Sequence, residues 1–297
     1  MQRLVYLISY PFLWCIASLP FRLFYLFSDL IFALLFYIVG YRRKVVQANL
    51  ELVFSDLSPD EISKIEKEFY RHMCDVFLET IKTMKIGRKD FIKRYQLINV
   101  ELLQEIERDK SVMVLIPHYG NWEWSIVTNL FFESQGYAVY QKIGNKYFDA
   151  MIKRIRAKWN TALIHQKEMV RIIIRNQQAG TNAVYGVVSD QSPQSHRTRY
   201  WRSFMGITVP VFDSPELLAR KFDLAVVFAK ISKLKRGHYQ LEFVPITKSA
   251  SETQEHEITD QFLRMTENSI GEQPAYYLWT HRRWKHRDKV PSEFQEK

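Results

Sequence analysis

The chain has 297 residues, of which 47% are hydrophobic and 25% are charged, a composition typical of globular proteins that excludes wholesale disorder. The net charge of +10 indicates an anionic partner, for which a nucleic acid, an anionic membrane surface and a phosphorylated substrate are the candidates. A charge that serves only solubility is the alternative.

The first forty residues are strongly apolar. No charged residue occurs between Leu4 and Phe21, and Asp29 is the only one between Leu23 and Tyr41. Each stretch approaches the roughly 20 residues that cross a bilayer. A carboxylate that faces lipid is energetically costly, so the second stretch is expected to lie at the interface or to pack against protein. Residues 1–41 are therefore predicted to form a membrane-anchoring segment, with a pair of buried core helices as the alternative.

The basic run "YRRK" follows this segment at Tyr41–Lys44. Positive residues are enriched on the cytoplasmic side of membrane segments, so the run places the remaining domain, residues 42–297, in the cytoplasm. This remainder is longer than most single domains, but its length does not require a division into two.

Helices and strands alternate through the rest of the chain. The sequence "SPDE" at Ser58–Glu61 has the N-cap residue, proline and glutamate of a helix start, and apolar residues then recur at helical spacing up to Thr80. Strands are predicted at residues 112–116, 137–141, 161–164, 183–188, 224–231 and 239–245. Further helices are predicted at residues 121–132, after Asn145, at 168–180, from the cap Ser214, and at 258–270. The alternation predicts an α/β fold: a single domain with a mostly parallel sheet flanked by helices.

Two polar residues closely follow predicted strands. His118 comes after "VMVLIP", and Asp190 comes after "AVYGVVS". Functional sites of parallel sheets lie at the carboxyl ends of the strands. We therefore expect His118 and Asp190 to meet at that edge of the sheet.

The stretch "HYGNWEW" begins with His118 and includes Glu123. A histidine can accept a hydroxyl proton as a general base, and it does so better when a carboxylate fixes its tautomer. Gly120 permits a turn that brings Glu123 back against His118, and the N–H groups of the following helix start are expected to hold an oxyanion or a phosphate. No "G-x-S-x-G" motif occurs, so the pair predicts direct attack by a substrate hydroxyl on an activated acyl group.

Simpler interpretations of this spacing remain open. The pattern H-x-x-x-x-E is common by chance, and such a pair is often structural. A metal site lacks support because no second histidine or cysteine lies at ligand spacing, and no cofactor is expected.

The stretch "HYGNWEW" resembles the H-x-x-x-x-D/E motif of the lysophospholipid acyltransferase superfamily, in the form found in lipid A secondary (late) acyltransferases. The segments "VYQKIGNKYFDAMIKRIR", "VVSDQSP" and "PAYYLWTHRRWKHR" resemble three further segments of that family, and the apolar N-terminus resembles its membrane anchor. The loop after Asp190 departs from better-known members, so acceptor and acyl-chain preferences do not carry over.

The resemblance implies a role for each matching residue. His118 would deprotonate the acceptor hydroxyl, and Glu123 would orient and charge-stabilise His118. Asn121 would position the acceptor or the helix start. Arg156, which borders the apolar stripe of its helix, would contact a phosphate or the acyl donor, whereas a surface arginine is the simpler interpretation. Asp190 would be an acceptor contact or a second carboxylate, and a turn-capping residue is its alternative.

The C-terminal segment is basic and aromatic. By the resemblance, His281, Arg282 and Arg283 would bind the acidic donor carrier, a phosphorylated sugar or lipid headgroups. A solvated run of charges is the alternative. A second basic loop, also consistent with an anionic substrate, contains His196, Arg197, Arg199 and Arg202.

The leading hypothesis is a membrane-bound O-acyltransferase of the bacterial inner membrane whose catalytic domain faces the cytoplasm. It would move a fatty acyl chain from acyl carrier protein, or from acyl-CoA, to a hydroxyl of a lipid A precursor in lipopolysaccharide biosynthesis. The alternatives are an acyltransferase for a glycerolipid, an aminolipid or a glycolipid, and a non-catalytic basic binding protein associated with membrane lipids. A nucleic-acid partner is not expected because no recognised module is present.

Overall fold

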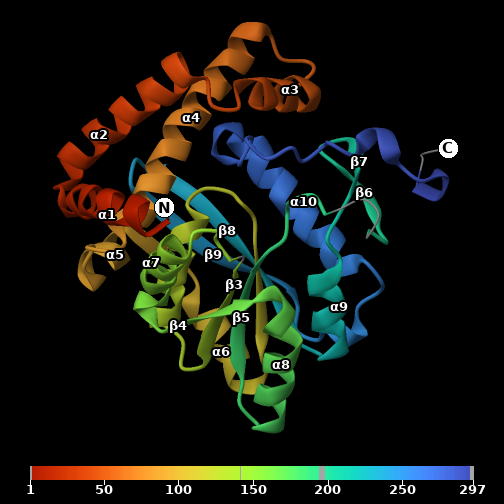
Figure 1. Cartoon of the computed structure of the whole chain (residues 1–297). Helices are drawn as coiled ribbons and strands as arrows, with labels where there is room; N and C mark the ends of the chain where they lie inside the picture. Colours follow the sequence, from red (N-terminus) through yellow and green to blue (C-terminus); the bar gives the residue numbers. More distant parts are fainter. Residues whose placement is uncertain (1, 141, 194–197, 295–297) are drawn as a thin grey trace.

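The fold is organised by one large sheet (Figure 1). The computed structural model describes residues 2–140, 142–193 and 198–294, and within them seven strands form this sheet in the order β1-β9-β8-β2-β5-β3-β4. The strands are β1 (Tyr95–Leu97), β2 (Val112–Ile116), β3 (Gln135–Tyr140), β4 (Thr161–His165), β5 (Ala183–Val188), β8 (Ala225–Lys235) and β9 (His238–Thr247). Neighbours from β4 to β8 are parallel, β9 returns antiparallel to β8, and β1 is parallel to β9. The predicted α/β fold with a mostly parallel sheet is confirmed.

Helices surround this sheet, and a short hairpin of β6 (Trp201–Phe204) and β7 (Ile207–Pro210) lies apart from it. The α-helices are α1 (Gln2–Ser18), α2 (Phe21–Ala33), α3 (Arg43–Val53), α4 (Pro59–Lys82), α5 (Arg88–Arg94), α6 (Val100–Asp109), α7 (Lys146–Arg156), α8 (Met169–Gln178), α9 (Ser214–Lys221) and α10 (Glu257–Glu272). A π-helical segment, η1 (Leu34–Val39), continues α2. The 3-10 segments are η2 (Trp122–Leu130), η3 (Ala157–Trp159), η4 (Gln166–Glu168), η6 (Ala250–Glu252), η7 (Pro274–Tyr276), η8 (Arg287–Lys289) and η9 (Ser292–Phe294).

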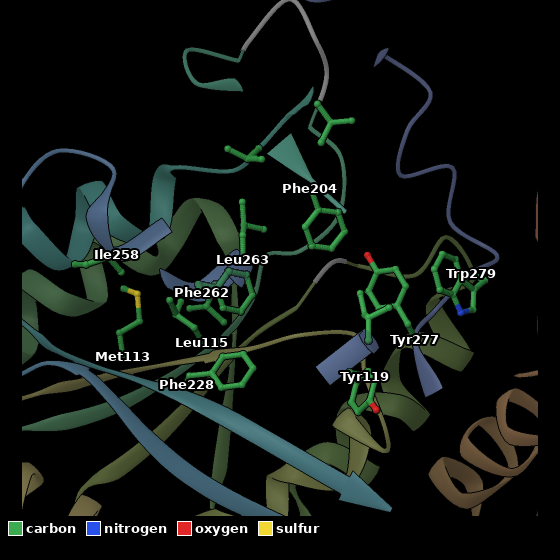
Figure 2. Close-up of a cluster of buried hydrophobic side chains, with 14 of the residues drawn as sticks. Met113, Leu115, Tyr119, Phe204, Phe228, Ile258, Phe262, Leu263, Tyr277 and Trp279 are labelled. Atoms are coloured by element: carbon green, nitrogen blue, oxygen red, sulfur yellow. The ribbon is translucent and has the colours of Figure 1, made fainter. Parts of the chain in front are cut away.

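Both faces of the sheet are covered, which explains why β2 is apolar at every position. Met113 and Leu115 of β2 belong to the cluster on the face covered by α8, α9 and α10. The alternate residues of β2 belong to a second cluster with residues of α5, α6 and η2. Figure 2 shows the first cluster, in which the α10 side chains Phe262 and Leu263 approach the sheet.

The N-terminal helices pack against α4, whose start has the predicted capping box of Ser58 and Glu61. Among the described residues, one helical stretch, Phe21–Val39, is long and apolar enough to cross a membrane. Its buried residues Phe24, Ser28, Phe32 and Phe36 are four positions apart, about one helical turn, and face the protein.

Several local predictions differ from the structure. The helix expected at residues 121–132 is the 3-10 helix η2, with Asn121 as its N-cap. Ser214 is the first residue of α9 rather than its cap, since Asp213 precedes it and no side-chain cap bond forms. The sequence analysis missed α3, α5, α6, β1, β6 and β7, which are mostly short. Gln141, predicted to end β3, lies outside the described residues.

Candidate active site

The loop that carries His118 has a tightly specified backbone. Gly120 has φ +58°, in the left-handed region, and a Cβ at this position would lie 2.6 Å from a methyl carbon of Ile231. The loop is also held by the C-terminal part of the chain, because Gly120 N–H donates to the Tyr276 carbonyl and Leu278 N–H donates to the His118 carbonyl. Gly120 therefore takes a backbone conformation that favours glycine, and any other residue here would be strained.

His118 contacts Asp190, as expected from the ends of their two strands. Their Nδ1 and Oδ1 atoms are 2.7 Å apart. The register of the parallel strands explains the contact: Ile116 of β2 pairs with Val188 of β5, so the residues two positions further along also lie side by side. The His118 side chain is 19% exposed, whereas the Asp190 side chain is fully buried.

The ionisation state of Asp190 determines which ring nitrogen of His118 carries the proton. Burial by itself raises the pKa of Asp190, but the charge of His118 and its hydrogen bonds outweigh this effect and hold the pKa below its usual value. The carboxylate is therefore ionised and can only accept, so Nδ1 of His118 is the protonated nitrogen. The other nitrogen, Nε2, accepts a hydrogen bond from the side-chain amide of Gln191 at 3.2 Å.

Glu123 does not hold His118, so the predicted contact between these two residues is wrong. The Glu123 carboxylate forms a two-pronged ion pair with Arg156 at the end of α7, with distances of 3.1 Å to Nε and 2.6 Å to Nη2. The physical reason is that η2 begins with a tight 3-10 turn. Because of this turn, the Glu123 side chain points toward α7, whereas His118 points toward the end of β5. The two predicted residues Glu123 and Arg156 are thus brought together, and both line the same cavity as His118.

Asn121 is buried and serves the helix start. Its Oδ1 accepts the Trp124 N–H at 3.0 Å, and its Nδ2 donates to Glu79 of α4 at 2.6 Å. The Trp124 N–H is therefore already bonded, which reduces the set of free donors expected for an oxyanion. Of the two roles expected for Asn121, positioning the acceptor or the helix start, the structure shows the second.

A cavity of about 920 Å³ opens beside these residues. His118, Glu123, Arg156 and Gln191 all line it. Much of the remaining wall is apolar and includes Val114, Ile116, Ile126, Val188, Leu241 and Phe243. The site therefore combines a histidine that contacts a buried carboxylate with a space suited to hydrocarbon chains.

Sequence comparison agrees with this geometry. The sequence matches the family described as bacterial lipid A biosynthesis acyltransferase over residues 2–286. The chain belongs to this family. The lipid A biosynthesis lauroyltransferase of Escherichia coli (strain K12) is 23% identical over 294 residues, which make up 95% of this chain and 92% of that protein. The resemblance noted in the sequence is confirmed, and the chain is an acyltransferase of lipid A biosynthesis.

In this acyltransferase the three residues of the C-terminal signature lie in different environments. His281 is half-buried, and its Nε2 accepts the Ser192 N–H at 3.1 Å, which supports the loop next to Asp190. Burial and the charge of Arg283 lower the pKa of His281 to about 4, so His281 is neutral. Arg283 is buried and donates to the Pro210 carbonyl at 2.9 Å, whereas Arg282 is exposed. Of the three, only Arg282 is exposed at the surface, and binding of an anionic partner by this segment stays a prediction.

The second basic loop is described only in part. His196 and Arg197 lie outside the described residues. Arg202 forms an ion pair with Asp260 of α10 at 3.0 Å. Arg202 is therefore engaged within the protein.

The sequence analysis missed Gln191 and the polar face of α4. Glu79 accepts hydrogen bonds from Tyr25, Asn121 and Tyr239, and His72 contacts the Gly120 carbonyl through Nε2. The signal was present in the sequence, because the buried polar residues of α4 recur at helical spacing beside its apolar stripe: His72, Asp75, Glu79 and Lys82. Polar residues repeated at that spacing indicate a buried hydrogen-bond network that supports the loop.

Proposed function

We propose that this acyltransferase moves a fatty acyl chain from an acyl-thioester donor to a hydroxyl group of a lipid A precursor. The observation that carries the proposal is the contact of His118, which lines the apolar cavity, with the buried, ionised Asp190 behind it. This contact makes Nε2 of the imidazole the acceptor nitrogen, which can take a proton from a substrate hydroxyl that replaces the Gln191 amide.

The reaction then needs no enzyme nucleophile. The acceptor hydroxyl displaces the Gln191 amide, gives its proton to Nε2 of His118 and attacks the thioester carbonyl carbon. The carbon–sulfur bond breaks as the ester bond forms, and the imidazolium returns its proton to the departing thiolate. Asp190 stabilises the imidazolium between these two proton transfers.

The ion pair of Glu123 and Arg156 in the cavity wall supports a substrate-binding role for Arg156. Glu123 holds the guanidinium in a fixed orientation, and both residues line the cavity. Arg156 keeps further N–H donors for a phosphate of the acceptor or of the donor. Glu123 is thus proposed as a positioning residue that acts through Arg156.

Acyl carrier protein is the proposed donor, since an acidic carrier suits the net charge of +10. The same donor, together with the basic run after η1, supports a location at the bacterial inner membrane with the catalytic domain, residues 42–297, on the cytoplasmic side. Residues 1–41 are proposed to attach this domain to the membrane.

The test is transfer of a radiolabelled acyl group to a purified lipid A precursor, with acyl carrier protein and coenzyme A compared as donor carriers. His118→Ala is expected to lower kcat by at least about 100-fold, the usual contribution of a general base. His256→Ala is the matched control, since this histidine does not line the cavity. Wild-type activity with His118→Ala would overturn the mechanism, and transfer to a glycerolipid, an aminolipid or another glycolipid alone would overturn the proposed acceptor.

A further inference from the structure

The apolar helices α1 and α2 are exposed on one side only, and in Figure 1 they lie on one flank of the molecule, beside α4. Along α2 and η1 the exposed apolar residues recur at helical spacing: Leu23, Leu26, Leu30, Leu34 and Ile38. On α1, Leu4, Leu7, Ile8 and Phe12 are also exposed. A one-sided apolar stripe is the pattern of a helix that lies along a surface.

The opposite side of α2 is attached to the protein by charged groups. Arg236, in the turn between β8 and β9, donates to both oxygens of Asp29 at 2.9 Å and also to Asp75 of α4. Ser28 donates to the same Asp75 at 2.7 Å. Asp29, the residue that makes this stretch unfavourable in lipid, is therefore paired with the protein, although its side chain is 40% exposed. This agrees with the expectation that the stretch packs against protein.

Two further contacts attach the ends of this hairpin of helices. The Lys82 ammonium donates to the Ala17 carbonyl at 2.8 Å and to that of Leu19, so it caps the C-terminal end of α1. Tyr25 donates to Glu79 at 2.7 Å and packs where a Cβ on Gly237 would collide with its ring. These contacts lie along the inner side of α2 and hold it antiparallel to α4, because Tyr25 meets Glu79 and Ser28 meets Asp75.

This attachment is incompatible with a helix that crosses a bilayer. Asp29 lies near the middle of the apolar stretch Phe21–Val39, so a crossing would place it near the bilayer midplane. Arg236 and Asp75 would have to enter the hydrocarbon with it, or Asp29 would have to lose its partners there. Either arrangement places charges where they are strongly disfavoured.

The charges around the hairpin identify the surface that it fits. Residues 1–50 contain five basic residues and one acidic residue, and the acidic one, Asp29, is paired with Arg236. Arg3, Arg22 and Lys44 are exposed near the start of α1, at the turn and beyond η1. Basic groups at both ends of an apolar stripe suit the headgroups of one anionic leaflet.

We propose that α1 and α2 lie in the plane of an anionic bilayer leaflet, with their exposed faces buried to the level of the acyl chains, and that neither helix crosses the bilayer. The proposal rests on the membrane association proposed above but not on acyl transfer. It also places the active site close to that leaflet, because Tyr6 of α1 stacks on Tyr147 of α7, the helix that ends in Arg156.

The test measures the depth of spin labels in the full-length protein bound to vesicles of phosphatidylethanolamine and phosphatidylglycerol. Labels are attached through Leu23→Cys, Leu30→Cys and Ile38→Cys in a chain with Cys15→Ser and Cys74→Ala. The three labels are expected at one shallow depth of about 5–10 Å, as in interfacial helices. A helix that crosses would instead place the label at position 30 about 15 Å deep, with the other two at opposite surfaces, and this result would overturn the proposal.

A second measurement keeps the result independent of the labels. Leu26→Ser with Leu30→Ser is expected to weaken vesicle binding at least tenfold and to leave the unfolding temperature unchanged, because both side chains are exposed. Val170→Ser with Ile174→Ser on α8, also exposed, is the matched control and should bind as the wild type does. Absence of vesicle binding by the wild type would overturn the membrane association itself, whatever the activity assay shows.

Discussion

Two carboxylates flank the loop of His118, and they differ in burial, partner and proposed task. Asp190 is fully buried and contacts the imidazole, whereas the Glu123 side chain is 15% exposed and pairs with Arg156 in the cavity wall. The one that shares a motif with His118 is not the one that touches it. The comparison teaches that a separation of five residues places Glu123 at the same cavity as His118, while the strand register determines which acid contacts the imidazole.

The largest effect is expected where this comparison is broken on the buried side. Asp190→Asn replaces an acceptor by a group that can donate to Nδ1, so His118 is expected to carry its proton on Nε2 and to lose its function as a base. The same substitution in serine proteases lowers kcat about 10⁴-fold, and we expect a loss of about 10²- to 10⁴-fold here, mainly in kcat. Steady-state kinetics with saturating donor measure it.

The control for this experiment is Asp213→Asn, which alters an aspartate that lines the cavity and does not contact His118. It should retain most of the activity. A loss of less than about tenfold for Asp190→Asn, in a protein that unfolds at the wild-type temperature, would mean that the His118–Asp190 contact does not serve catalysis.

A smaller effect is expected for the ion pair of Glu123 and Arg156. Glu123→Gln and Arg156→Gln each leave one charged group without its partner, and we expect each to lower kcat/KM by about 10- to 100-fold, mainly through KM. Because the two side chains act as one unit, the double variant should be no worse than the poorer single variant. Additive losses, or a fall in kcat alone with Glu123→Gln, would instead support a direct role of Glu123 in the chemistry.

A third carboxylate, Glu79, extends the comparison to the support of the loop. Burial and the nearby Asp75 raise its pKa to about 7, above the ordinary 4.5, although hydroxyl donors oppose the shift. The folded state then binds this proton more strongly than the unfolded state, so the stability from Glu79 is present below about pH 4.5 and is lost as the pH rises through 7. As the pH rises from 5 to 8, the free energy of unfolding of Glu79→Gln should therefore increase relative to that of the wild type by about 1–3 kcal/mol.

Urea unfolding at a series of pH values measures this difference. Tyr239→Phe is the matched variant, because it removes a hydrogen-bond donor that lowers the pKa of Glu79 and should move the transition to higher pH. A free energy difference between Glu79→Gln and the wild type that does not vary with pH would contradict the assignment.

These regions also show how far the sequence could be interpreted. The run "VMVLI" predicted a buried strand, and the polar residues after two such strands predicted that His118 and Asp190 would meet. The contact of Glu123 could not be predicted in the same way, because local spacing does not reveal whether a turn is α-helical or 3-10. Short strands such as β1 and β6 have too few residues for a periodic pattern.

The signature near the C-terminus illustrates the same limit. His281, Arg282 and Arg283 are consecutive and were predicted to bind one anionic partner. In the structure Arg283 is buried against Phe204 and the Pro210 carbonyl, which helps hold the hairpin of β6 and β7. A run of basic residues gives no indication of which one faces the solvent, because that depends on the packing of distant segments.

The smallest effect is expected for the exposed member of that run. Arg282→Ala removes a charge from the surface, so the unfolding temperature and kcat should match those of the wild type. If Arg282 attracts the acidic donor carrier, KM for acyl carrier protein should rise by about fivefold at most, and the difference should disappear at high salt. With an uncharged thioester analogue as donor the variant should be indistinguishable from the wild type. A salt-independent loss with both donors would mean that Arg282 supports the fold in the way that Arg283 does, and the distinction between the exposed and the buried arginine would then fail.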